Sequence, residues 1–350
     1  MTIDLRSDIE IQPTDAMRRA MASAEVGDDG AREDPTVNRL EERCAEVVGK
    51  EAAVFVASGT MANQLAMLAL ARAGHIVVCA EGAHVSNKER GASALLAGLS
   101  FVEVPSPHGE LTGDQVRAVL DRYPRTVDLL VVENTHQSAS GFPWSPAAMG
   151  EAAAAAHAAG VPVYMDGARL FNAAVARGVS PLAYCDVVDG LMFCLSKGLG
   201  APVGSVVCGS EPFVEEVRER KLQLGGGWRQ AGFLAAAGLI ALDEGRARLH
   251  EDHATARQLA EGIAAATPGV VDPETVSTNI VFADPKPLGV GAAALCQTLS
   301  SYGVLCKVVG GRLRLVTHRD ITAEHVQQAL AQWRRATDSL VEGSLLAVRA

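Results

Sequence analysis

The alternation of short apolar runs with helical patterns is the feature that most restricts the fold of this chain. From residue 52 to residue 208, apolar runs of strand length are separated by segments with helical periodicity. This order is typical of a mostly parallel sheet with helices on both faces. The expected strands are Ala52–Ala57, His75–Ala80, Ser100–Pro105, Asp128–Val132, Val161–Met165, Gly190–Cys194 and Gly204–Cys208.

Helical patterns fill the intervals between these runs. The helix expected from Thr112 begins with a capping-box-like pair, Thr112 and Gln115. The helices expected in this part of the chain are Thr60–Arg72, Ser86–Ala97, Thr112–Arg122 and Ser145–Ala159.

The pattern changes after about Gly245, where long helical segments are followed by a few short strands. We therefore predict an α/β fold with a large domain over residues 1–245, including an N-terminal arm, and a small α+β domain over residues 246–350. The large domain would hold a sheet of the seven-stranded type. Around and beyond the boundary we expect helices Ala231–Glu244, Arg246–Ala266, Ala292–Tyr302 and Ala323–Leu340, strand Asn279–Ala283, and the hairpin-like pair Val304–Val309 and Arg312–Val316.

Composition excludes several classes of function. A net charge of −10 over 350 residues argues against nucleic acid as a partner. The sequence has neither a signal-peptide pattern nor an apolar run long enough to span a membrane. None of the 7 cysteines forms a CxxC pair, so we expect reduced thiols, a cytoplasmic location and no metal site.

Polar residues follow the apolar runs where the expected strands end. In parallel sheets ligands bind at the carboxyl ends of the strands, so these residues would meet at one edge. Their convergence indicates an enzyme. The segments are Ser58-Gly59-Thr60, Glu81 to His84, Glu133 to His136, Asp166 to Arg169 and Ser196-Lys197.

Three of these segments fit an anionic, ring-shaped cofactor. Ser58-Gly59-Thr60 begins a helix, where free N–H groups favour a phosphate, although an ordinary N-cap has the same pattern. Asp166 ends a buried strand and could keep a ring nitrogen protonated, or could be a structural ion-pair partner. Lys197 follows an apolar run, and a partly desolvated lysine can form a Schiff base, although a lone lysine is more often a surface residue.

Several blocks resemble the signatures of L-threonine aldolases, which are pyridoxal 5'-phosphate (PLP) enzymes of the aspartate-aminotransferase-like fold (fold type I). The resemblance runs from about Asp4 to His318. The blocks are DLRSD, EDPTVNRLE, SGTMANQ, ENTH, DGARLFNAAVARGV, CLSKGLGAPVGS, GGGWRQAG and RLVTH.

The resemblance implies a role for each matching position in cofactor binding. Lys197 would link to the cofactor, Asp166 would pair with its pyridine nitrogen, and His84 would stack on the ring. Gly59 and Thr60 would hold the phosphate. Arg169 and Arg229 complete the residues expected around the cofactor, and Arg229, with Lys221, matches a block that in relatives can reach a neighbouring subunit's cofactor phosphate.

The resemblance also implies the substrate and the reaction. Ser7, Arg169 and Arg314 would bind a substrate carboxylate, for which an arginine fork is well suited. The implied reaction is retro-aldol cleavage of L-threonine, L-allo-threonine or a related β-hydroxy-α-amino acid to glycine and an aldehyde. Lys197, His84 and His136 would be catalytic, and the base for the β-hydroxyl is left open between His136, His84 and a bound water. The resemblance further implies a homodimer or homotetramer with shared active sites.

The chain departs from the family pattern near its N-terminus. Where the family usually reads GDDVYGEDPT, this chain has Ala31 in place of a tyrosine and Arg32 in place of a glycine. These changes leave the β-substituent of the preferred substrate open. Another PLP reaction on the same fold (β-elimination, transaldolase or aminotransferase chemistry) and a non-catalytic PLP-binding protein are the alternatives.

Overall fold

The chain forms two compact units. The structure is a computed structural model that describes the backbone of residues 2–349 and the side chains of residues 2–341. One unit spans Gln12–Ala247, and the other combines the residues up to Ile11 with those from Arg248 onward.

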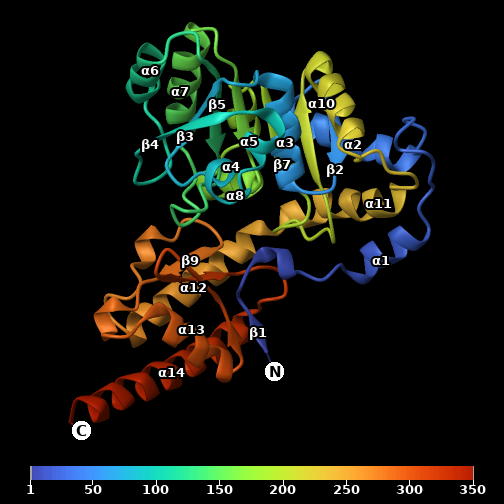
Figure 1. Cartoon of the computed structure of the whole chain (residues 1–350). Coiled ribbons are helices and arrows are strands. Elements are labelled where there is room, and N and C mark those ends of the chain that lie inside the picture. Colours follow the sequence, from blue (N-terminus) through green and yellow to red (C-terminus); the bar gives the residue numbers. More distant parts are fainter. Residues whose placement is uncertain (1, 350) are drawn as a thin grey trace. The chain divides into compact units, whose positions relative to one another are not determined.

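A seven-stranded sheet forms the centre of the Gln12–Ala247 unit (Figure 1). Strand β8 runs antiparallel to both of its neighbours, and the remaining strands run parallel to one another. The predicted α/β fold with a mostly parallel sheet is therefore confirmed. In spatial order the strands are β2 (Ala52–Val56), β8 (Ser205–Gly209), β7 (Gly190–Cys194), β6 (Val163–Asp166), β5 (Val127–Glu133), β3 (Ile76–Ala80) and β4 (Ser100–Val104).

The register of the sheet aligns the strand ends that carry polar residues. Asp166 on β6 lies opposite Glu133 on β5 and Met192 on β7. On the other side of the sheet, Ser205 on β8 lies opposite both Cys194 and Val56. The chain therefore leaves β2, β5, β6 and β7 at the same edge.

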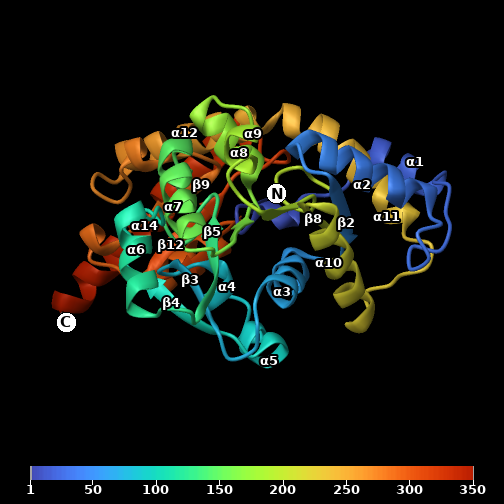
Figure 2. The same ribbon diagram turned by 90° about the horizontal axis from the view of Figure 1, so that it is seen from above.

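Helices cover both faces of this sheet (Figure 2). On one face α3, α5 and α10 bury apolar side chains against Val54, Val77, Leu129 and Met192. On the other face α2 packs on β2 and β8, and α11 packs on α2. The helices of this unit are α1 (Asp15–Ala22), α2 (Pro35–Val48), α3 (Gly59–Leu70), α4 (His84–Asn87), α5 (Ala92–Ala97), α6 (Gly113–Arg122), α7 (Pro146–Ala158), α8 (Leu170–Arg177), α9 (Leu182–Cys185), α10 (Glu211–Gln223), α11 (Gly232–Ile240) and a π-helical turn (Ala241–Gly245).

Side-chain caps begin the helices that matter for the site. The Ser58 hydroxyl accepts a hydrogen bond from the Met61 N–H and fixes the first turn of α3. Asp34 caps α2 in the same way through the N–H groups of Thr36 and Val37. At α6 the capping box of Thr112 and Gln115 is present, as the sequence predicts.

The helix predicted over Ser86–Ala97 is instead two short helices, α4 and α5. Arg90 and Gly91, between them, have φ angles of 55° and 74°. Helix α4 ends at Asn87, and the left-handed backbone at these two consecutive residues separates it from α5, which begins at Ala92. Because of this break, the residues just before Gly91, including Glu89, follow a different path from the one that a continuous helix would give them.

The second unit has a three-stranded antiparallel sheet, in the order β11, β12, β9. Its core is formed by apolar residues of α12, α13, α14 and the strands, including Leu259, Leu295, Leu313 and Trp333. The predicted run Val304–Val309 is two strands, which are separated at Cys306 and pair with different partners. The elements are β1 (Ile3–Asp4), α12 (Leu249–Ala266), β9 (Ile280–Ala283), α13 (Ala292–Ser301), β10 (Val304–Leu305), β11 (Lys307–Val309), β12 (Arg312–Val316), α14 (Ala323–Arg349) and the 3-10 turns Asp8–Glu10, Pro273–Thr275 and Lys286–Leu288.

The N-terminal segment groups with this second unit, whereas the sequence-based division assigned it to the large domain. Strand β1 pairs in parallel with β10, and Ile3 and Leu5 are buried in the core of the second unit. Ile3 and Leu5 are buried by residues about 300 positions later in the chain, such as those of β10. Spacing in the sequence does not indicate contacts over such a separation, so the N-terminal segment was grouped with the large domain. The division into domains 1–245 and 246–350 stays a prediction.

Among the helices of residues 2–349, none has both the length and the apolar character needed to cross a membrane.

Candidate active site

A small cavity lies at the strand-end edge of the Gln12–Ala247 unit. Its lining comes from the segments that follow β2, β3, β5, β6 and β7, together with the strand residues Glu133, Asp166 and Met192. The lining residues are Gly59, Asn63, His84, Glu133, Thr135, Gln137, Asp166, Ala168, Arg169, Met192 and Lys197.

Lys197 reaches this cavity from a tight loop after β7. The Leu195 and Ser196 N–H groups both donate to the Gly204 carbonyl, at 3.0 and 3.2 Å, and the Gly200 N–H donates to the Lys197 carbonyl at 2.8 Å. Gly204 has a φ of 109°, and a Cβ there would lie 2.3 Å from the Phe55 ring. The loop therefore requires glycine at this position, and it returns the chain to the sheet as β8 directly after presenting Lys197.

Asp166 is held in place by two hydrogen bonds at the end of β6. Its Oδ1 accepts from the Ala168 N–H at 3.1 Å, and its Oδ2 accepts from Asn63 Nδ2 at 2.8 Å. The residue is only 2% exposed. A buried carboxylate with fixed orientation is suited to pairing with a protonated ring nitrogen.

A second buried carboxylate, Glu89, lies behind the cavity. It accepts hydrogen bonds from Asn63 Nδ2 at 2.8 Å, from Gln64 Nε2 at 2.6 Å and from His84 Nδ1 at 2.9 Å. Asn63 thus donates to Glu89 and to Asp166, and this shared donor stabilises two carboxylates that would otherwise repel each other.

The environment of His84 favours its charged form. Burial on its own would lower the pKa of His84, but the hydrogen bond to Glu89 and the nearby charge of Asp166 outweigh burial, so the pKa is raised. Because Nδ1 is bonded to Glu89, Nε2 is the ring nitrogen left for a bound ligand. His84 therefore lines the cavity as a group that can hold a proton.

The first turn of α3 borders the cavity through Gly59. A Cβ on Gly59 would lie 2.9 Å from Met192 Cε and 3.1 Å from Cys194 Sγ, so glycine lets α3 begin close to β7. Thr60 is exposed in the same turn and is not part of the cavity lining. The free N–H groups of such a turn, together with the helix dipole, favour an anion.

His136 is buried beside the cavity and does not line it. Its side chain is 1% exposed, and a Cβ added to Gly109 would overlap its ring. Its neighbours Glu133 and Thr135 do reach the cavity, and the Glu133 carboxylate accepts from the His84 and Gln137 N–H groups. Among the described residues, the buried hydroxyl of Thr135 has no hydrogen-bond partner.

Ser7 and Arg314, predicted to bind the substrate carboxylate, both belong to the second unit. Arg314 Nη2 donates to the Arg6 carbonyl at 3.1 Å, so the structure brings Arg314 next to the residue that precedes Ser7. Both side chains are buried. Arg312, on the same strand, instead stacks on Phe282, with 4.4 Å between its Cζ and the ring centroid.

Arg229 and Lys221 are bound to two aspartates of the loop before α2. Lys221 is buried and its Nζ lies 2.7 Å from Asp29 Oδ2, whereas Arg229 is exposed and lies 2.9 Å from Asp28 Oδ2. Neither residue lines the cavity. The ion pair with Asp29 leaves Lys221 poorly placed to bind a phosphate, since removing a partner from a buried pair costs roughly 3–5 kcal/mol.

Sequence reasoning missed Asn63, Glu89 and the orphan hydroxyl of Thr135. One signal was present, because Asn63 lies four residues after Gly59 and therefore on the same face of α3. Glu89 gave no such signal, since its role depends on how the segment after α4 packs against α3.

Comparison with known proteins assigns the chain to a family. Residues 4–286 match the family model described as beta-eliminating lyase. Low-specificity L-threonine aldolase 1 of Arabidopsis thaliana is 38% identical over 98% of each chain. The chain belongs to the threonine aldolase family.

Solved structures agree with the threonine aldolase fold. The threonine aldolase of Leishmania major superposes with a TM-score of 0.78, at 18% identity, over 96% of this chain and 99% of that one. A structure of SPT with PLP superposes with a TM-score of 0.75, at 20% identity, over 97% and 88% of the two chains. This similarity shows that the fold is that of PLP fold type I enzymes.

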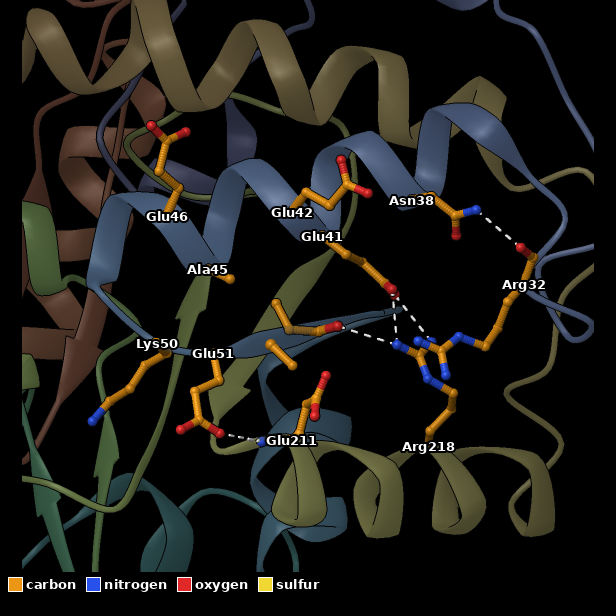
Figure 3. Close-up of a pocket in the computed structure, with 12 residues that line it drawn as sticks. Arg32, Asn38, Glu41, Glu42, Ala45, Glu46, Lys50, Glu51, Glu211 and Arg218 are labelled. Atoms are coloured by element: carbon orange, nitrogen blue, oxygen red, sulfur yellow. Dashed lines mark hydrogen bonds and ion pairs between the residues drawn. The ribbon is translucent and has the colours of Figure 1, made fainter.

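Arg32, which replaces a glycine of the threonine aldolase pattern, is not part of the lining of the strand-end cavity. It borders a separate groove between α2 and α10, where Glu41 and Arg218 form an ion pair at 2.9 Å (Figure 3). Arg32 Nη1 lies 2.8 Å from Glu215 Oε1, and the Arg32 carbonyl accepts from Asn38. In this chain the added arginine is thus paired on the surface, and the neighbouring Ala31 is exposed.

Proposed function

We propose that this protein is a PLP-dependent lyase that cleaves L-threonine, L-allo-threonine or a related β-hydroxy-α-amino acid into glycine and an aldehyde. The observation that carries the proposal is that Lys197, Asp166 and His84 line one cavity at the strand ends of a threonine aldolase family chain. Membership of the family supplies the reaction class, and the cavity supplies the groups that the reaction needs.

The lining of the cavity fits pyridoxal 5'-phosphate. Lys197 offers an amine for the covalent link, Asp166 a fixed carboxylate for the ring nitrogen, and the Gly59 turn a place for the phosphate. The orphan hydroxyl of Thr135 supports a polar occupant, because a buried hydroxyl without a partner is costly until a ligand bonds to it. When bound, the cofactor supplies an electron sink that stabilises negative charge at the substrate Cα.

His84 is the group that we propose moves the proton of the β-hydroxyl. With Nδ1 fixed by Glu89, a neutral His84 presents Nε2 as an acceptor, and its raised pKa makes it a stronger base. Cleavage of the Cα–Cβ bond needs this proton to be removed as the aldehyde leaves. His136 remains a candidate only if its ring becomes accessible, since it is 1% exposed here. A bound water is the third candidate.

The substrate carboxylate is proposed to bind to Arg169, Arg314 and Ser7. Arg169 lines the cavity and is 5% exposed, so it presents its charge in a place largely screened from water. The contact between Arg314 and the Arg6 carbonyl supports a joint role for Arg314 and the N-terminal segment. Thr60 and Arg229 are retained as phosphate ligands, Arg229 toward a neighbouring subunit.

We further propose a cytoplasmic homodimer or homotetramer with shared active sites. All seven cysteines are free thiols, which supports a reducing compartment. The exposed position of Arg229 supports a role toward a second copy. Size-exclusion chromatography with light scattering would test the assembly, and a monomer with full activity would contradict it.

The preferred substrate is proposed to have a bulkier or more polar β-substituent than threonine. Ala31 removes the side chain that a tyrosine would place there, and Arg32 adds a positive charge. The surface pair of Arg32 with Glu215 is 56% and 52% exposed, so it is worth at most about 1 kcal/mol and can be released. Higher kcat/KM for threonine than for phenylserine and 3-hydroxyaspartate would contradict the proposal.

The central experiment combines product analysis with Lys197→Ala. The wild-type protein should release glycine and aldehyde in equal amounts and should show the absorbance of bound PLP. Lys197→Ala should lose that absorbance and nearly all turnover, whereas Lys88→Ala, a lysine outside the cavity lining, should retain both. Release of a keto acid or transfer of the amino group would favour one of the other PLP reactions. Binding of PLP without any turnover would favour the non-catalytic alternative.

A further inference from the structure

Two thiols of the second unit lie in contact. Cys296 is on α13, and Cys306 separates β10 from β11. Their Sγ atoms are 3.6 Å apart, and Cys296 Sγ also lies 3.5 Å from the Cys306 carbonyl oxygen. We infer that Cys296 and Cys306 form an oxidation site, which closes to an intramolecular disulfide when the protein meets a peroxide.

The other cysteines are not built for this chemistry. All seven lie in the described part of the chain, and of these Cys296 alone is not buried. Burial raises the pKa of the thiols of Cys44, Cys79, Cys185 and Cys208, and it also raises the pKa of Cys306, so Cys296 is the thiol expected to react first with a peroxide. Cys194 accepts a hydrogen bond from the Ser205 hydroxyl inside the sheet. Oxidation is therefore expected to begin at Cys296.

The reaction balances with one peroxide for each disulfide. The Cys296 thiolate attacks a peroxide oxygen, the O–O bond breaks, and Cys296 becomes a sulfenic acid while the leaving oxygen takes up a proton. The Cys306 sulfur then attacks Cys296 Sγ, the S–O bond breaks, and water leaves with the Cys306 proton. Two thiols lose two electrons in total, and the peroxide gains them.

Forming this bond must bring the two sulfurs closer together. The sulfurs have to approach from 3.6 Å to about 2.05 Å, a change of about 1.5 Å that links α13 to the segment between β10 and β11. On one side of Cys306, the Leu305 carbonyl accepts from the Leu5 N–H at 2.8 Å. On the other side, Lys307 is the register partner of Arg314.

The bond would therefore tether a segment that contacts both predicted carboxylate-binding elements. Ser7 follows the N-terminal strand paired with β10, and Arg314 lies on the strand paired with β11. If the proposed function is right, oxidation should raise KM for the amino acid more than it lowers kcat. This consequence rests on the proposed function, but the oxidation site itself does not.

The oxidation site is tested without measuring activity. Hydrogen peroxide is added to the PLP-loaded full chain, free thiols are counted, and peptides are mapped by mass spectrometry without reduction. We expect the loss of two thiols, a mass lower by about 2 Da, and one cross-linked pair of peptides holding Cys296 and Cys306. Dithiothreitol should restore both thiols. Cys296→Ser and Cys306→Ser should form no cross-link, and Cys79→Ser, which removes a buried thiol, should still form it.

Three results would overturn the inference. The first is oxidation of Cys296 to a sulfinic acid while Cys306 remains a free thiol. The second is a disulfide between two chains. The third is loss of the two thiols in unfolded protein but not in folded protein. A disulfide that forms and leaves KM unchanged would overturn the effect on the substrate site. Absence of aldolase activity would count against the proposed function, but it would not affect the conclusion drawn from the mapped disulfide.

Discussion

Glu89 is the residue on which the electrostatics of the cavity depend. Its side chain is fully buried, and it accepts hydrogen bonds from Asn63, Gln64 and His84. Its hydrogen bond to His84 raises the pKa of the His84 imidazole. Its hydrogen bond from Asn63 holds the amide that also donates to Asp166, and so helps to orient that carboxylate. One carboxylate thus positions two different cavity residues without lining the cavity itself.

Glu89→Gln should lower the pKa of His84, because the substitution removes the negative charge that stabilises the imidazolium. The acid limb of the profile of kcat/KM against pH should then move to lower pH, since we propose that His84 acts in its neutral form. The loss of orientation should lower the maximal kcat/KM by about tenfold. Glu103→Gln, which removes an exposed carboxylate that binds the Gly82 N–H, is the matched control. An unchanged acid limb in Glu89→Gln would show that His84 is not the titrating base.

Thr135→Val should separate ligand binding from stability. The substitution removes a buried hydroxyl with no partner among the described residues, so the cofactor-free protein should be as stable as the wild type or more stable. If a bound ligand uses this hydroxyl, the affinity for PLP or for the amino acid should fall by about tenfold, which corresponds to roughly 1.4 kcal/mol. Thermal unfolding of the cofactor-free protein and spectroscopic titration with PLP measure the two effects.

Thr135→Ser keeps the hydroxyl and is expected to bind both ligands like the wild type. Equal affinities in all three proteins would mean that the Thr135 hydroxyl has no role in binding.

At the scale of elements, the close approach of α3 to β7 shapes the end of the cavity where we propose that the phosphate binds. Gly59 allows this approach, because any Cβ there would meet Met192 and Cys194 on β7. Met192 also lines the cavity, so a shift of its side chain would change the cavity directly.

Gly59→Ala should therefore weaken PLP binding and also lower the free energy of unfolding by about 1–3 kcal/mol, as overpacking does. Gly150→Ala is the control, because a Cβ at this position inside α7 meets no atom within 4 Å. It should raise the free energy of unfolding by roughly 0.5–1 kcal/mol and leave PLP binding unchanged. Urea unfolding and PLP titration of both variants test the difference. Normal PLP affinity in Gly59→Ala would argue against this turn as the phosphate site.

The elements that sequence predicts well are those specified by local pattern. Strand β7 is predicted at Gly190–Cys194 and found at Gly190–Cys194, because a continuous apolar run is bounded by Asp189 and Ser196. The capping box of α6 follows from two residues in the same turn. Local pattern fails at α4 and α5, where a helical period continues through Arg90 but the backbone turns left-handed.

The parts of the site that depend on tertiary contact could not be predicted in this way. Lys197, Asp166 and His84 were predicted because each lies at or after the end of a strand, and parallel strands end at one edge. The burial of His136 depends on the loop around Gly109 packing over its ring, which no spacing in the chain indicates. The pairing of Lys221 with Asp29 joins residues of distant segments in the same way.

At the scale of the whole molecule, cofactor binding should stabilise the fold. A ligand that binds only the native state adds about 2.7 kcal/mol at a concentration of 100 times its Kd. Removing PLP by dialysis against a competing amine should therefore lower Tm, and adding it back should restore Tm. Lys197→Ala should gain less from added PLP, because it lacks the covalent link. Identical Tm values with and without PLP in the wild type would contradict binding at a structured site.

The order of strands in the sheet also has a consequence for synthesis. Strand β2 is made early, but it lies at the edge of the sheet, and its neighbour there is β8, which ends at Gly209. While the ribosome is still translating the segments between them, β2 has no strand to pair with, and the first turn of α3 has no anchored strand before it. The cofactor end of the sheet should therefore be completed only when residues 205–209 emerge. Arrest-peptide measurements on nascent chains should show a pulling-force step at that length, and a step before β8 emerges would mean that β2 is anchored by another contact.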